Sequence, residues 1–105
     1  MNPTNDRCDL FAERVREQPD NPMFRFSYGQ ALTGAGRNAE AVEHLRIAAA
    51  SRADWMMPRI LLGKALLASG DPAGARTAFE DALHLARSQG HEEPEEELVA
   101  LLATL

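Results

Sequence analysis

The sequence predicts an all-α protein in which antiparallel helix–turn–helix repeats stack into a short α-solenoid of about six helices. Two observations favour this fold. Proline, glycine and capping residues divide the chain into helix-length segments, and no segment alternates with the period of two that a half-buried strand shows. The chain also repeats itself at an offset of 34 residues, with nine identical positions between residues 22–55 and 56–89: Met23/Met57, Arg25/Arg59, Gly29/Gly63, Ala31/Ala65, Leu32/Leu66, Gly36/Gly70, Ala39/Ala73, Ala41/Ala75 and Ala48/Ala82.

The first helix is predicted over residues 6–18 and is stopped by Pro19, which is excluded from a helix interior. Cys8 is the only cysteine, so the sequence provides neither an intrachain disulfide nor a thiolate metal cluster. We expect it to be a half-buried helix residue, because it lies among apolar residues at helical spacing: Leu10, Phe11 and Val15.

The second helix is predicted to follow Asn21 and to end at Gly36. Asparagine is a good N-cap, Pro22 suits the first helical position, and glycine accepts the left-handed conformation past a helix end. The third helix begins at Asn38 and carries a row of apolar residues on one side: Ala41, Val42, Leu45 and Ala48.

The fourth helix is predicted to start near Met56 or Met57, which leaves Pro58 in its first turn, and to end at Gly70. The fifth helix is predicted to start at Asp71-Pro72, which repeats the cap-and-proline signal of the second helix, and to stop at Gly90.

The sixth helix is predicted over residues 94–104, beginning at Pro94. Glutamates crowd its first turn, where the helix dipole favours negative charge. Its apolar stripe has i, i+3, i+4, i+7 spacing and consists of Leu98, Leu101, Leu102 and Leu105.

Gly29 and Gly63 lie in the middle of predicted helices, where glycine costs about 1 kcal/mol relative to alanine. Their recurrence at one repeat position indicates close approach between paired helices. We expect Ala41 and Ala75 on the facing helices.

These repeated residues resemble the tetratricopeptide repeat, whose first helix carries leucine-glycine and whose second carries alanine followed four residues later by phenylalanine. The first unit offers Tyr28-Gly29, Leu32, Ala41 and Leu45, and the second offers Leu62-Gly63, Leu66, Ala75 and Phe79. The chain departs from the family pattern in three ways. The usual tryptophan position holds Arg25 and Arg59. The tyrosine position holds Leu32 and Leu66. The closing proline is missing in both units, where Ala53 and Arg87 stand instead.

The resemblance implies a right-handed solenoid built as a single domain over residues 1–105, with full repeats at 22–55 and 56–89. Two repeats are fewer than a stack usually needs, so we expect the ends to be covered. The helices at 6–18 and 94–104 are expected to act as N- and C-terminal caps.

In this family the first helix of each repeat lines a concave groove that receives an extended or helical peptide. The resemblance therefore implies a groove lined by Met23, Phe26, Gln30 and Thr33 from the first unit and Met57, Ile60, Lys64 and Leu67 from the second. This surface is mostly apolar, and its methionines suit varied apolar side chains. We expect a protein–protein interaction module. The alternatives are a groove buried internally, or an assembly element whose groove mates with a second copy, as a homodimer, or with the rest of a larger protein.

Trp55 lies at the junction between the repeats and is a candidate anchor for a partner. The alternative is a half-buried plug between the stacked units. Arg25 and Arg59 are expected at the groove's shoulder, either solvated or paired with Asp20 and Asp54.

Composition argues against other function classes. The net charge is −5 and no basic face is evident, so no nucleic-acid partner is expected. No apolar run approaches the roughly 20 residues of a membrane span, and the first residues lack the pattern of a secretory signal, so we expect a cytoplasmic protein without a membrane partner. The histidines have no metal-binding i+3 or i+4 partner among themselves, and the glycines form no phosphate loop. The three histidines are His44, His84 and His91. We therefore expect no enzymatic activity, no bound metal and no cofactor.

Overall fold

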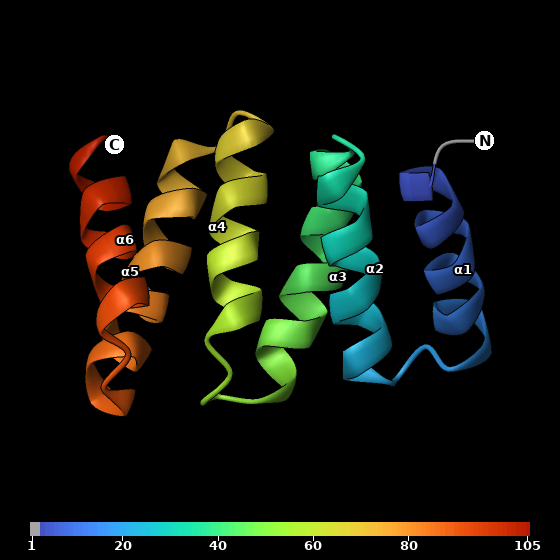
Figure 1. The fold of residues 1–105 in the computed structure, drawn as a ribbon, viewed down its shortest axis with the longest axis horizontal. Helices are drawn as coiled ribbons and strands as arrows, with labels where there is room; N and C mark the ends of the chain where they lie inside the picture. The colour runs from blue at the N-terminus through green and yellow to red at the C-terminus, as the bar shows by residue number, and fades with distance from the viewer. Residues whose placement is uncertain (1–2) are drawn as a thin grey trace.

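The computed structural model describes residues 3–105, and over that range it consists of six helices without a strand (Figure 1). The all-α repeat fold expected from the sequence is therefore confirmed. The helices are α1 (Pro3–Glu17), α2 (Pro22–Gly34), α3 (Asn38–Ser51), α4 (Met57–Ala68), α5 (Pro72–Gln89) and α6 (Glu92–Ala103).

The helices stand in a row, each packed against the next along the chain (Figure 1). Each helix therefore buries most of its contact surface on its neighbours in sequence, as the one-dimensional stacking of a repeat protein requires, and α2 also touches α4. The largest fully buried side chains lie at these contacts and include Leu32 from α2, Leu45 from α3, Phe79 from α5 and Leu98 from α6.

Two predicted boundaries differ from the structure. The helix expected over residues 6–18 begins at Pro3, and the helix expected over 94–104 begins at Glu92. Pro94 consequently lies inside the first turn of α6, where its missing N–H has no intrahelical partner to lose. Proline in this position marks the first turn of a helix, whose start can precede it by up to two residues.

The turns after α2, α4 and α5 share one backbone geometry, so each of these helices ends in the same way. Gly36, Gly70 and Gly90 all have positive φ, at 77°, 92° and 72°. After α4, the backbone N–H of Asp71 donates to the carbonyl of Leu66 at 2.8 Å, which closes the turn expected at a left-handed C-terminus. Left-handed backbone is costly for residues with a Cβ, so glycine is required here.

The mid-helix glycines accommodate large side chains from the facing helix. A Cβ at Gly29 would lie 2.6 Å from Cγ of Leu45, and a Cβ at Gly63 would overlap the ring of Phe79. The expectation of close approach at these glycines is met. The side chains that fill the space, however, are Leu45 and Phe79, which lie four residues after the expected alanines. The alanines, Ala41 and Ala75, are themselves fully buried.

Cys8 is more deeply buried than expected, with 1% of its surface exposed. It lies on the face of α1 that also buries Val15, and α1 packs against α2. The expectation of a half-buried residue was wrong because α2 covers this face of α1.

Candidate functional site

The eight residues predicted to line a groove lie on α2 and α4 and differ in their exposure. Met23, Met57 and Leu67 are exposed apolar side chains, and Gln30 and Lys64 are exposed polar ones. Phe26 and Thr33 are half-buried. Ile60 has only 5% of its surface exposed and belongs to the core, so it can form the floor of a groove but not its rim.

A pocket of about 260 Å³ lies between α4 and α6. Three of the predicted residues line it from α4, namely Met57, Ile60 and Lys64, together with Leu61. The opposite wall comes from α6 and was missed from the sequence: Glu93, Pro94 and Glu97. The pocket therefore has an apolar floor and a charged rim.

One ion pair crosses this pocket. Nζ of Lys64 lies 2.9 Å from Oε1 of Glu97, and both side chains are about half exposed. A pair with that exposure contributes little to stability, at about 0–1 kcal/mol. It can open at small cost, which makes both charges available to an incoming group.

The α2 half of the predicted groove is partly covered by Trp55. The rings of Phe26 and Trp55 stack with centroids 5.1 Å apart and an interplanar angle of 19°. Trp55 is half-buried, and the guanidinium carbon of Arg52 lies 6.0 Å from the centre of its ring. This is the arrangement of a plug between repeats, and it removes one face of Phe26 from the groove.

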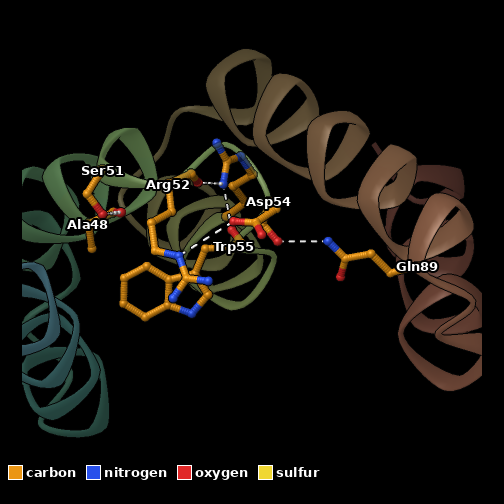
Figure 2. A network of polar contacts seen from close by, with 7 residues as sticks. Ala48, Ser51, Arg52, Asp54, Trp55 and Gln89 are labelled. Carbon is orange, nitrogen blue, oxygen red and sulfur yellow. Dashed lines mark hydrogen bonds and ion pairs between the residues drawn. The ribbon is translucent and has the colours of Figure 1, made fainter.

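Polar contacts hold the α3–α4 connection that carries Trp55 (Figure 2). The amide of Gln89, at the end of α5, donates to the carbonyl of Asp54 at 2.7 Å. Nε of Arg52 lies 3.5 Å from Oδ1 of Asp54, and Ser51 Oγ donates to the carbonyl of Ala48 at 2.6 Å. The Gln89 bond thus ties the connection to the far end of the second repeat, whereas the Ser51 bond closes the last turn of α3.

Arg25 and Arg59 occupy the same repeat position and have the same task. Nε of Arg25 donates to the carbonyl of Pro19 at 2.9 Å, and Nη1 of Arg59 donates to the carbonyl of Trp55 at 2.5 Å. Each arginine therefore fastens the loop that precedes its own helix. Of the two expected alternatives, pairing with Asp20 and Asp54 is not found among the described side chains: Asp54 pairs with Arg52 instead.

The surroundings of His44 favour its neutral form. Nη1 of Arg25 lies 3.0 Å from its Nδ1, and the ring of Tyr28 is tilted against it with centroids 4.5 Å apart. A guanidinium can only donate, so Nδ1 must be the unprotonated acceptor. Burial, and then the charge of Arg25, lower the pKa of His44 below its usual value of 6.5.

Stability is expected to fall as the pH drops below 6.5, because the unfolded chain then binds a proton at His44 that the folded chain rejects. Above 6.5 neither state is protonated and this contribution vanishes. Urea unfolding of wild type and His44→Asn across this range measures it. The variant keeps a side-chain acceptor for Arg25 and should show the shallower pH dependence; equal slopes would contradict the assignment.

Two further findings concern the described residues alone. Among them, no cluster of three or more His, Cys, Asp or Glu side chains is arranged to hold a metal ion. None of their helices combines the length and apolar character needed to cross a membrane.

Comparison with known proteins gives a consistent result. Residues 9–55 and 56–81 match family models described as tetratricopeptide repeat. A TPR repeat-containing protein of Pseudomonas aeruginosa, PA0015, is 37% identical over 86 residues, which is 82% of each chain.

Two solved structures share the fold over 96% of this chain. The type III secretion translocator chaperone SycD of Yersinia enterocolitica superimposes with a TM-score of 0.88 at 16% identity, covering 70% of that chain. PcrH, solved in complex with the chaperone binding region of PopD, superimposes with a TM-score of 0.86 at 20% identity, covering 77% of that chain.

Proposed function

We propose that this chain, which belongs to the tetratricopeptide repeat family, is a protein-interaction module that holds a peptide segment or helix of a partner along α2 and α4. The observation that carries the proposal is the pocket between α4 and α6, with Met57 exposed at its edge. An apolar side chain of the partner enters this pocket. The partner's backbone runs across α4 toward Met23 on α2.

The chemistry of the pocket supports this assignment. Its volume of about 260 Å³ suits one amino-acid side chain and is small for a cofactor. Met57 is 45% exposed, and methionine adapts to apolar groups of different shape. Lys64 and Glu97 stand at the rim, where they can exchange their mutual contact for backbone or side-chain groups of a partner.

The structural neighbours are compatible with the proposal. PcrH has the same fold, and its structure contains the chaperone binding region of PopD. A six-helix stack of this kind can therefore present a surface that holds part of another protein. At 20% identity the likeness to PcrH supports the shared fold alone. The kind of partner proposed for this chain is therefore argued from its own groove residues.

Met57→Glu is expected to weaken binding of a groove peptide at least tenfold, a loss of about 1.4 kcal/mol, because the new carboxylate must be desolvated beside Glu93 and Glu97. Peptides selected from a display library against the wild type supply the ligand, and titration calorimetry gives the affinities. Met57 is exposed, so the variant should keep wild-type helicity by circular dichroism.

Ala50→Glu is the matched control, since it adds the same charge at an exposed site on α3. Equal affinity of Met57→Glu and wild type, or an equal loss in Ala50→Glu, would contradict the groove assignment. The main alternative is that the groove mates with a second copy. That arrangement predicts a mass that levels off at twice 11.5 kDa and that Met57→Glu returns to the monomer.

A further inference from the structure

The pocket between α4 and α6 carries more negative than positive charge. Its rim holds two carboxylates, Glu93 and Glu97, and one ammonium, that of Lys64. Lys64 is paired with Glu97 at 2.9 Å, whereas Glu93 has no ion-pair partner among the side chains that the structure describes. A group that enters the pocket therefore meets one carboxylate whose charge is not balanced within the described residues.

The rest of α6 adds to this negative charge. The helix carries five glutamates and no basic residue, so its formal charge of −5 equals that of the whole chain. Of these five, only Glu95 and Glu97 pair with a cation among the described side chains. The dipole of α6 places about half a positive charge at this end, which is too small to offset five carboxylates. The α6 side of the pocket is therefore a region of negative potential, which attracts cations from solution.

The α2 half of the groove has no charge of its own. The four residues that α2 contributes to it are neutral, namely Met23, Phe26, Gln30 and Thr33. On α4, Lys64 is the one charged residue among the groove positions, and Glu97 balances it. The groove therefore runs from a neutral, largely apolar half on α2 to an acidic edge on α6.

We propose that the partner segment held in this groove is basic, with a lysine or arginine beside the apolar side chain that enters the pocket. This inference rests on the proposed function, because it specifies the ligand of the same groove. The apolar side chain of the partner lies on the floor formed by Met57 and Ile60, and the neighbouring cation lies over Glu93. An acidic segment would oppose both carboxylates of the rim and is disfavoured.

The charge of α6 contributes selectivity more than affinity. Glu93 is exposed, and an ion pair at an exposed site changes affinity by about two- to fivefold. Burial of the apolar side chain supplies the larger part of the binding free energy. Because salt screens exposed charges, we expect the preference for a basic segment to be largest at low ionic strength.

Selection from a peptide display library tests the charge of the partner directly. The wild-type chain at low ionic strength is the bait, and the library admits every amino acid at each position. Relative to the unselected library, the selected peptides should be enriched in lysine and arginine next to an apolar residue. An absence of this enrichment, or an enrichment in aspartate and glutamate, would overturn the proposal.

Removing the charge of one carboxylate tests where the cation lies. The probes are the most enriched peptide and a neutral version of it, in which glutamine replaces each lysine and arginine. By titration calorimetry, Glu93→Gln should weaken the basic peptide about two- to fivefold and leave the affinity of the neutral one unchanged. Glu80→Gln is the matched control, since it removes the same charge from an exposed site on α5. An equal loss in both variants, or no loss in Glu93→Gln, would refute the contact with Glu93.

Lys64→Gln should change the affinity in the opposite direction. The substitution removes the ammonium that pairs with Glu97, so a cation of the partner can contact both carboxylates of the rim. The basic peptide should bind about two to five times more tightly than it binds the wild type, and the neutral version should show no such gain. Weaker binding of the basic peptide would assign Lys64 as the contact of the partner and would contradict the proposal.

The charge of the partner and the groove assignment are tested separately. Met57→Glu is measured with the neutral peptide, because a cation of the basic one can pair with the added carboxylate. If Met57→Glu weakens the neutral peptide while Glu93→Gln has no effect on the basic one, the groove holds a partner and the basic character of that partner is refuted. If Met57→Glu leaves the neutral peptide unaffected, the groove assignment fails and the inference that rests on it fails as well.

Discussion

Replacing Phe79 with alanine is expected to lower the free energy of unfolding by about 3–5 kcal/mol. Phe79 is fully buried and its ring lies directly over Gly63, so the variant leaves a cavity between α4 and α5 that the glycine cannot fill. A domain of this size has about 5–15 kcal/mol of stability in total. The variant should therefore unfold at a much lower urea concentration than the wild type.

Leu67→Ala provides the comparison, since Leu67 of α4 is 37% exposed and its truncation should cost far less than that of the fully buried Phe79. Urea denaturation followed by circular dichroism measures both. The second repeat would not depend on the Phe79–Gly63 contact if Phe79→Ala cost no more than Leu67→Ala.

The helix order was predictable because its signals are local. Asn21 and Asp71 accept hydrogen bonds from the first-turn amides of α2 and α5, and the turn glycines have positive φ. Both signals act within a few residues of the chain. The offset of 34 residues then predicted the repeated packing.

The contacts between helices were less predictable. The sequence indicated that something approaches Gly63, but the rotation of α5 decides that Phe79 and not Ala75 fills the space. Ile60 shows the same limit: its repeat position assigned it to the groove, and the tight packing of α4 buries it. The loop-fastening role of Arg59 depends on the course of the chain from Arg52 to Trp55, which no residue pattern specifies.

Half of the pocket was also hidden from the sequence. The run of glutamates has a sufficient local explanation as the start of a helix, since the dipole favours carboxylates there. That Glu93 and Glu97 face α4 follows only from the packing of α6 along the row. The opposite charges of Lys64, the only lysine of the chain, and of the glutamate run were the one signal available for this pairing, and they did not specify which glutamate faces α4.

Leu98→Ala is the second substitution with a large expected effect, at about 2–5 kcal/mol. Leu98 is the one fully buried side chain of α6. The polar contacts that also hold this end are exposed: Arg87 with Glu95 at 3.0 Å, Lys64 with Glu97 at 2.9 Å, and Arg76 with the carbonyl of Leu105 at 3.0 Å. Exposed contacts of this kind contribute little. The lost stability should therefore appear mainly as local unfolding, in which α6 detaches from α5.

The functional consequence distinguishes Leu98→Ala from a general loss of stability. Without α6 the pocket loses Glu93, Pro94 and Glu97 but keeps its α4 wall. Hydrogen exchange should show faster exchange in α6 than in α2–α4, and a groove peptide should bind more weakly at temperatures where the rest of the chain stays folded. Val99→Ala, on the exposed side of α6, controls for truncation of the same helix. If Leu98→Ala speeds exchange equally in all helices, α6 unfolds together with the stack, and the pocket is then as stable as the repeats that support it.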